Sequence, residues 1–146
     1  MDFHNQIQSI LTTGIRKLGL NVAIVSVIQG DSYKVYACDS GDSGIKVGDH
    51  FELSGTYCSD VIKKEQTKFY EDVAEISEML KHPCYQATQL RAYIGTPIIL
   101  NNQIWGTLNY SSMSPHKNLY STDEIKFIEH QAKEIAALIQ TKQLET

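Results

Sequence analysis

The sequence predicts an α/β domain in which helices pack against a central antiparallel sheet of five or six strands. The best evidence for the sheet is a β-hairpin at residues 92–110, where Asn101 and Asn102 join two apolar segments and tolerate turn conformations. The best evidence for the helices is an amphipathic segment at each end of the chain. At 146 residues the chain has the usual length of one domain, so we expect a single domain at 1–146.

An amphipathic helix is expected first. Apolar side chains recur on one helical face over residues 3–18, and Gly19 supplies the type of residue at which helices often end. Gly14 should weaken this helix by about 1 kcal/mol relative to alanine. Residues 22–28 are almost continuously apolar and rich in β-branched side chains, which predicts a strand covered on both faces.

The middle of the chain predicts shorter elements between polar loops. A turn at 30–31 leads into an alternating strand at 33–38, and a polar loop with several glycines follows at 39–48. The remaining short elements are an extended piece at 51–53, a helix at 56–64, a strand at 67–70, and a loop with a broken helix at 73–85 that Pro83 interrupts.

The second strand of the hairpin has two different faces. One face carries Ile104, Gly106, Leu108 and Tyr110, and the other carries Trp105, Thr107, Asn109 and Ser111. The first set suits a hydrophobic core. The second set mixes an aromatic ring with hydrogen-bonding groups, so we expect that face to line a pocket.

The last helix is marked by a cap and an apolar stripe. Ser121 and Glu124 have the spacing of a capping box. The stripe consists of Ile125, Ile128, Ala132, Ile135 and Ile139. It is able to cover the domain's own sheet, to form a dimer seam, or to do both, and its heptad-like period is compatible with a coiled coil in a longer parent protein.

Charge and composition exclude several classes of protein. With 13 basic and 17 acidic residues, the net charge is −4, which gives no basis for binding a nucleic-acid backbone. The longest apolar run, at 22–28, is too short for a membrane span, so no direct membrane insertion is expected. Cys38, Cys58 and Cys84 form no disulfide framework, which indicates a cytoplasmic location, whether free or in a membrane-anchored parent.

Three segments in order resemble the GAF domain, a sensory module of bacterial signalling proteins. They read GDHFELSGTYCS at 48–59, HPCY followed by LRAYIGTPI within 82–98, and IWGTLNYSS at 104–112. The resemblance covers nearly the whole chain. It implies a PAS-related sheet with the N- and C-terminal helices on one face and a ligand pocket on the other.

The resemblance also implies a function. Domains of this family bind cyclic nucleotides, tetrapyrroles, haem or other small organic molecules, and some have no known ligand. We therefore expect a non-catalytic module that binds a small molecule, forms a homodimer through its terminal helices and regulates an output domain. The parent protein would be a sensor histidine kinase, a diguanylate cyclase or phosphodiesterase, or a similar signalling protein.

The candidate ligand-binding residues are tyrosines with neighbouring polar groups in the segments that form the pocket of similar domains. They are Tyr57, Cys58, Asp72, Cys84, Tyr85, Arg91, Tyr93, Thr96, Thr107 and Asn109. Tyrosines offer flat apolar faces, and hydroxyl and amide groups fix a ligand's orientation. Each tyrosine taken singly is more often a core aromatic. For Arg91 a surface or pocket-rim role is preferred, with Asp72 or an anionic ligand as its partner.

Two alternatives remain at this point. Some GAF-fold enzymes reduce free methionine sulfoxide with cysteines in the regions of Cys58 and Cys84, although this chain lacks their CG pair and has Tyr85 where an acidic residue follows the second cysteine. The other alternative is a module that only dimerises. A covalent bilin is disfavoured because no Cys-His pair is present, and no metal site is expected because the histidines and cysteines lack zinc-ligand spacing.

Overall fold

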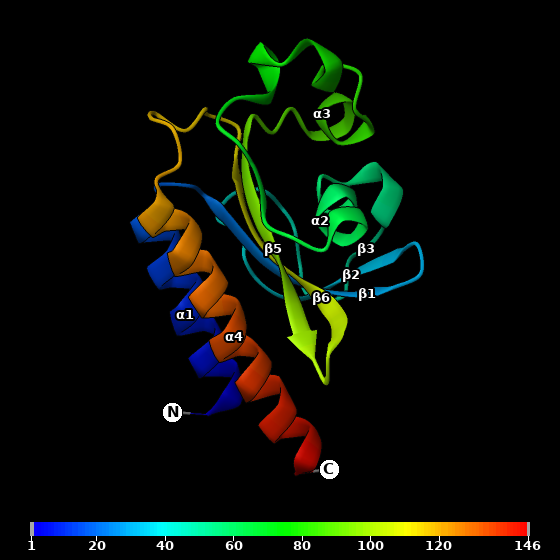
Figure 1. Ribbon diagram of the computed structural model, residues 1–146, viewed down its shortest axis with the longest axis vertical. Coiled ribbons are helices and arrows are strands. Elements are labelled where there is room, and N and C mark those ends of the chain that lie inside the picture. The colour runs from blue at the N-terminus through cyan, green and yellow to red at the C-terminus, as the bar shows by residue number, and fades with distance from the viewer. Residues whose placement is uncertain (1, 146) are drawn as a thin grey trace.

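The computed structural model describes residues 2–145 as a six-stranded antiparallel sheet with helices on both faces (Figure 1). The strand order is β3-β2-β1-β6-β5-β4. The strands are β1 Val22–Gln29, β2 Ser32–Asp39, β3 His50–Glu52, β4 Lys68–Tyr70, β5 Ala92–Leu100 and β6 Gln103–Ser112. The helices are α1 Phe3–Leu18, α2 Cys58–Lys64, α3 Pro83–Thr88 and α4 Thr122–Leu144, with 3-10 turns η1 Leu53–Gly55, η2 Val73–Glu75 and η3 Ser77–Met79. The expected fold class is confirmed.

The two terminal helices, α1 and α4, cover one face of the sheet. They run antiparallel side by side, so that the start of α1 and the end of α4 lie at the same end of the molecule (Figure 1). Leu11 of α1 and Ile128 and Ile135 of α4 are fully buried against Leu108 of β6. Because successive side chains of a strand point to opposite faces, every second residue of the covered strands packs against α1 and α4, and the residues between them point to the opposite face.

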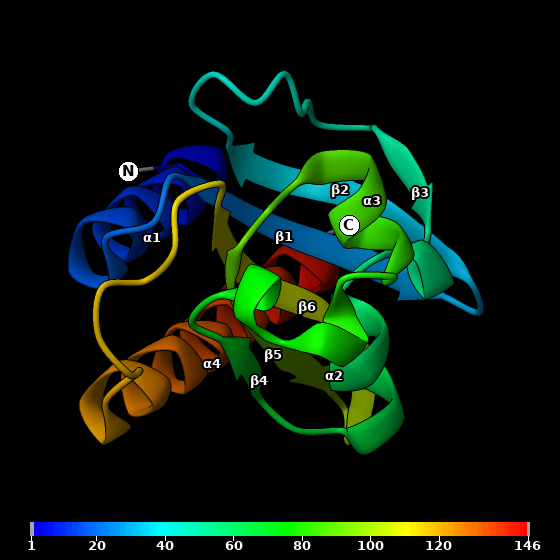
Figure 2. The same cartoon turned by 90° about the horizontal axis from the view of Figure 1, so that it is seen from above.

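The opposite face is covered by shorter helices. α2 and α3 lie on the side of the sheet away from α1 and α4 (Figures 1 and 2). Cys58 and Val61 of α2 and Cys84 of α3 form a second buried cluster with Tyr33 of β2 and Tyr93 of β5. The molecule therefore has two apolar layers with the sheet between them.

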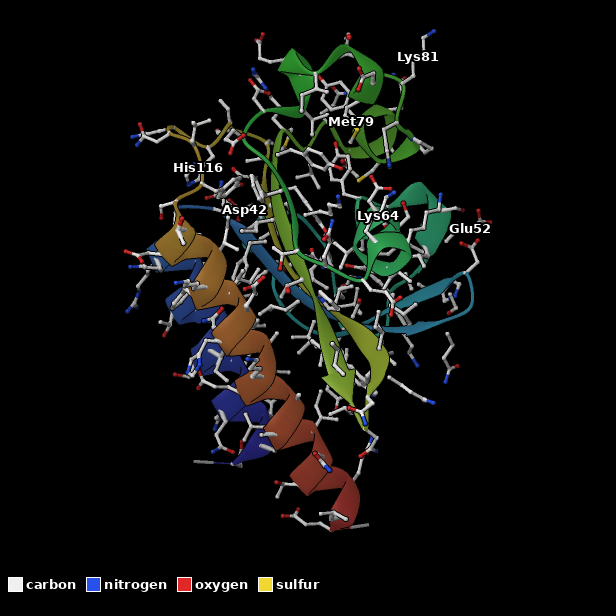
Figure 3. The ribbon with its side chains drawn as sticks, in the orientation of Figure 1. Asp42, Glu52, Lys64, Met79, Lys81 and His116 are labelled. Carbon is white, nitrogen blue, oxygen red and sulfur yellow. The ribbon has the colours of Figure 1, made fainter. Side chains whose placement is uncertain are left out.

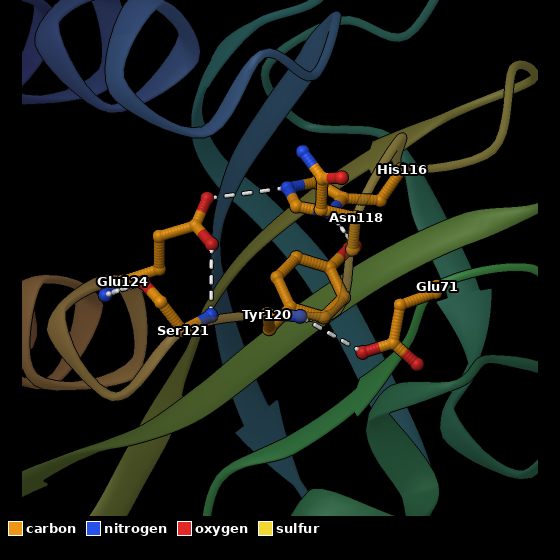
Figure 4. A network of polar contacts seen from close by, with 6 residues as sticks. All are labelled: Glu71, His116, Asn118, Tyr120, Ser121 and Glu124. Carbon is orange, nitrogen blue, oxygen red and sulfur yellow. Dashed lines mark hydrogen bonds and ion pairs between the residues drawn. The ribbon is translucent and has the colours of Figure 1, made fainter.

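The start of α4 is fixed by the predicted capping box and by contacts to the preceding loop. Ser121 Oγ accepts from the backbone N–H of Glu124 at 3.0 Å, and Glu124 Oε1 accepts from that of Ser121 at 2.9 Å. The other carboxylate oxygen of Glu124 lies 3.1 Å from His116 Nε2 (Figure 4). Glu71, just after β4, accepts from the backbone N–H of Tyr120 at 3.0 Å. These contacts join the loop before α4 to the edge of the sheet.

The expected alternation along β6 is wrong at one position. A register shift after Ile98 leaves Trp105 as an extra residue between Ile104 and Gly106. Because a bulge rotates the side chains beyond it, the indole turns to the helix-covered face and packs edge-on against Tyr36, with ring centroids 4.9 Å apart. Trp105 therefore does not lie on the pocket face.

Pro83 also has a different role from the one expected. It begins α3 instead of interrupting a helix, since the first turn of a helix has no use for its missing N–H. His82 caps this helix, because its Nδ1 accepts from the backbone N–H of Cys84 at 3.0 Å. The segment at 73–82 forms two 3-10 turns.

Candidate functional site

A cavity of about 400 Å³ lies between the sheet and the layer of short helices. This volume falls toward the lower end of the range of about 300–1,000 Å³ that is typical of small-molecule sites. Its wall is mostly apolar and aromatic. The lining residues are Ile24, Tyr33, Ile45, Phe51, Glu52, Gly55, Thr56, Tyr57, Cys58, Pro83, Cys84, Ala87, Thr88, Leu90, Tyr93, Asn109 and Ser111.

The sheet side of the cavity carries a buried polar network. The Thr107 hydroxyl lies 2.6 Å from that of Ser26 and 3.3 Å from Cys58 Sγ. Cys58 Sγ in turn lies 2.9 Å from the Tyr93 hydroxyl. These hydrogen bonds allow the four polar side chains to be buried at little net cost, and they hold the side chains in fixed positions at the cavity.

Asn109 of β6 extends the network to Tyr33 of β2. Its side-chain nitrogen donates to the Tyr33 hydroxyl at 3.1 Å and approaches Thr107 Oγ1 at 3.4 Å. Its side-chain oxygen accepts no hydrogen bond from the residues that the structure describes, although the residue lines the cavity. Asn109 therefore has hydrogen-bonding capacity left for a bound molecule.

Burial keeps this network uncharged. Desolvation raises the pKa of the Cys58 thiol to about 11, against hydrogen bonds from Thr107 and Tyr93 that lower it. Burial also raises the pKa of Tyr33 and that of Tyr93 well above their ordinary value. At neutral pH these three groups are protonated, so the floor of the cavity is polar but neutral.

The roof is built around an aromatic ring at the start of α2. The Tyr57 hydroxyl donates to the backbone carbonyl of Leu90 at 2.8 Å. Its ring contacts those of Tyr93 and His82, with centroids 5.3 and 5.0 Å away. Burial lowers the pKa of His82, whose Nδ1 accepts from Cys84, so its ring is neutral. These contacts fix the position of the Tyr57 ring in the roof relative to Tyr93 in the floor.

A family model decides the affiliation of the chain. The model of the GAF domain matches residues 2–140. The chain belongs to the GAF domain family. Comparison with the curated proteins gives no match.

Solved structures with different activities share this GAF fold. The GAF domain of Acinetobacter phosphoenolpyruvate-protein phosphotransferase is 13% identical, with a TM-score of 0.74 over 99% of this chain and 85% of that one. The GAF domain of PixJ from Thermosynechococcus elongatus, in its blue-light absorbing form, is 15% identical, with a TM-score of 0.75 over 99% and 89%. Free methionine-R-sulfoxide reductase from Neisseria meningitidis is 12% identical, with a TM-score of 0.76 over 99% and 82%. At these identities the likeness shows the fold alone.

In this GAF domain, half of the candidate residues lie together. Tyr57, Cys58, Cys84, Tyr93 and Asn109 line the cavity. They come from four separate elements, α2 with its N-cap Tyr57, α3, β5 and β6, which the sheet and the packing of the two helices bring together. Thr107, a sixth candidate, lies just beneath the lining and bonds to Cys58 and Asn109.

The other four candidates lie outside the lining. Arg91 donates to both carboxylate oxygens of Asp72, at 2.9 and 2.7 Å. This ion pair holds the pKa of Asp72 below its ordinary value and makes Asp72 the partner of the arginine. Tyr85 packs against the second cluster without lining the cavity.

Thr96 lies on the opposite face of the sheet from Tyr93. The two residues are an odd number of positions apart along β5, and a side-chain period of two turns such residues to opposite faces. The Thr96 hydroxyl lies 2.8 Å from that of Thr67, which donates to Glu129 of α4 at 2.6 Å. Grouping Thr96 with the pocket tyrosines overlooked this alternation.

Sequence reasoning missed the contribution of β2 and β3. Tyr33 and Phe51 line the cavity, with their rings edge-to-face at 5.9 Å. The alternation at 33–38 does place Tyr33 and Val35 on one face, which was a usable signal. That this face meets Asn109 depends on β1 pairing with both β2 and β6, which no local pattern reveals.

Residues 2–145 contain no group of three or more His, Cys, Asp or Glu side chains arranged to hold a metal ion. Within the same range, no helix has the length and hydropathy needed to cross a bilayer.

The raised pKa of Cys58 predicts a loss of stability at high pH. A thiol whose pKa is higher in the folded than in the unfolded chain stabilises fully below the unfolded pKa, and this contribution is lost as pH rises through about 11. We expect wild type to lose about 2 kcal/mol more than Cys58→Ser between about pH 8 and about pH 11. Urea denaturation at both pH values measures the difference. Equal losses in the two proteins would contradict it.

Proposed function

We propose that this GAF domain is a non-catalytic sensor that binds a small molecule in the cavity and passes the change to its terminal helices. The main support is the cavity itself, whose volume, apolar wall and few fixed polar groups match those of small-molecule sites. Apart from the side-chain oxygen of Asn109, the network beneath it is hydrogen-bonded without a ligand, so the empty state is stable and binding adds to it.

A short path joins the cavity to both terminal helices. Asn109 and Tyr110 are consecutive in β6, so one side chain enters the cavity while the next enters the helix-covered core. The Tyr110 hydroxyl donates to Gln131 of α4, whose side-chain nitrogen donates to the backbone carbonyl of Ile10 in α1 at 2.9 Å. A ligand that shifts β6 would therefore move the contact that ties α4 to α1.

We propose further that α1 and α4 pair with a second copy and regulate an output domain of a cytoplasmic signalling protein. Ile10 and Leu138 are half-buried apolar residues that line a shallow hollow between the two helices. Such a hollow suits contact with a partner helix. A histidine kinase, or a diguanylate cyclase or phosphodiesterase, would be a suitable output.

A thiol-dependent reductase is the second candidate, since free methionine-R-sulfoxide reductases share the fold. The chemistry of the cysteines weighs against it. The attacking species would have to be a thiolate, yet burial raises the pKa of Cys58 to about 11 and also raises that of Cys84. Both thiols are protonated at neutral pH, which favours the sensor over the enzyme.

The sensor is tested by closing the cavity from the outside. Ala87 is an exposed residue of α3 that lines the cavity, so Ala87→Trp would place a large ring at the opening without disturbing the core. Lys81→Trp is the matched control, because Lys81 projects away from the domain (Figure 3). A fragment collection with acidic, basic and neutral aromatic members is measured by thermal shift, and the purified protein by native mass spectrometry.

We expect wild type and Lys81→Trp to be stabilised by the same fragments, by about 2.7 kcal/mol at 100 times Kd. In Ala87→Trp the affinity for them should fall by about tenfold or more. If no fragment stabilises wild type and no small molecule is retained, or if all three proteins respond alike, the proposed sensor function is rejected in favour of a module that only dimerises.

A further inference from the structure

The part of the cavity wall that the structure describes carries no positive charge. Among the described residues that line it there is no lysine, arginine or histidine, and the single charged side chain is the exposed carboxylate of Glu52. The arginine nearest in sequence to a lining residue is Arg91, beside Leu90, and both of its bonded nitrogens face Asp72. The wall therefore offers nothing to neutralise an anion.

The buried polar groups of the wall, and His82 beside it, are neutral. Burial keeps the thiol of Cys58 and the hydroxyls of Tyr33 and Tyr93 protonated, and it keeps the ring of His82 uncharged. A carboxylate or phosphate that entered this space would lose its hydration without gaining a counter-charge. An uncharged molecule has no such penalty.

The shape of the wall favours a flat apolar body. Four aromatic side chains line the cavity, and the edge-to-face contacts of Tyr33 with Phe51 and of Tyr57 with Tyr93 keep their rings in place. Planar rings pack well against aromatic edges and faces. The side-chain oxygen of Asn109 is a polar atom in this wall with hydrogen-bonding capacity left, so it is positioned to fix the ligand's orientation.

On the basis of the proposed sensor function, we propose that the ligand is a planar aromatic molecule of one or two rings that carries no negative charge and hydrogen-bonds to Asn109. Nucleotides carry phosphates and tetrapyrroles carry propionates, so both classes require cations that this wall lacks. The residues present do not fit a bilin, because the lining also contains no Cys-His pair.

The test compares pairs of probes that share a ring system, one member neutral and the other carrying a carboxylate. The pairs are indole with indole-3-carboxylate, 2-naphthol with 2-naphthoate, and benzamide with benzoate, each titrated into wild type by calorimetry at neutral pH. We expect the neutral member of at least one pair to bind about tenfold or more tightly than its acid. Ala87→Lys adds a cation at the exposed edge of the cavity, and Ala87→Gln is its neutral control.

In Ala87→Lys the affinity for the acids should rise severalfold relative to the neutral probes, and in Ala87→Gln it should not. Acids that bind wild type as tightly as the neutral probes, with both blocked by Ala87→Trp, would overturn the ligand class and leave the sensor standing. No gain for acids in Ala87→Lys would likewise overturn the role given to charge. Absence of binding by every probe and every fragment would reject the sensor and, with it, this inference.

Discussion

Replacing Gly106 by alanine is expected to destabilise this GAF domain by about 3 kcal/mol or more, a large share of the roughly 5–15 kcal/mol typical of a domain. A Cβ at this position would lie 1.8 Å from the backbone oxygen of Ser26 and 3.2 Å from the Cα of Val27. Both atoms belong to the backbone of β1, which is buried between two layers and paired on both sides. The strand cannot yield without breaking the sheet at its centre.

The matched control is Gly55→Ala. A Cβ on Gly55 meets no atom within 4 Å, and its backbone conformation suits any residue. The control should be neutral or slightly stabilising, by up to about 1 kcal/mol, because alanine restricts the unfolded chain. Urea denaturation followed by circular dichroism measures both variants. Equal stabilities for Gly106→Ala and Gly55→Ala would show that the sheet accommodates the methyl group.

Gly14→Ala is the second large effect, and here intrinsic propensity and tertiary structure predict opposite signs. In an isolated helix the change would stabilise by about 1 kcal/mol. In the folded domain the new Cβ would lie 1.9 Å from the Tyr110 hydroxyl oxygen. Tyr110 is fully buried and donates to Gln131, so its ring has no free space to enter. We expect a net loss of about 2 kcal/mol.

A double-mutant cycle tests this explanation. Tyr110→Leu removes the ring atoms that the added methyl group would meet, so Gly14→Ala should cost less in that background, or even stabilise. The coupling is read from denaturation midpoints of the four proteins. Equal costs of Gly14→Ala in both backgrounds would contradict the close fit between α1 and Tyr110. Because Tyr110 links β6 to both helices, the cycle also probes the proposed signalling path.

The local sequence pattern predicted most helices and strands, but not how pairing with a neighbouring strand alters the direction of a side chain. The capping box at Ser121 and Glu124 and the glycine at the end of α1 are present as expected, since a cap depends on residues a few positions apart. Trp105 was misplaced because a bulge shifts the register of β6 against β5. An isolated glycine within a strand, such as Gly106, is a known sign of such a bulge or of close backbone approach.

For the candidate site, too, some residues could be predicted from the sequence and others depended on the tertiary structure. Tyr57, Cys58, Tyr93 and Asn109 were found because the resemblance located the pocket segments, and these residues do line one cavity. Thr96 was included with them although its parity along β5 places it on the other face. The placement of β2 residues beside the hairpin needed the strand order, which is set by pairings between segments far apart in the sequence.

By itself, the sequence determined the family, the positions of the helices and strands, and which face of each is apolar, because periods of about 3.6 and 2 act over short stretches of chain. Only the tertiary structure decided that β1 lies between β2 and β6, that Gly14 accommodates Tyr110, and that the described residues of the cavity wall include no cation. These properties depend on which distant side chains meet, and that is fixed by packing the whole chain at once.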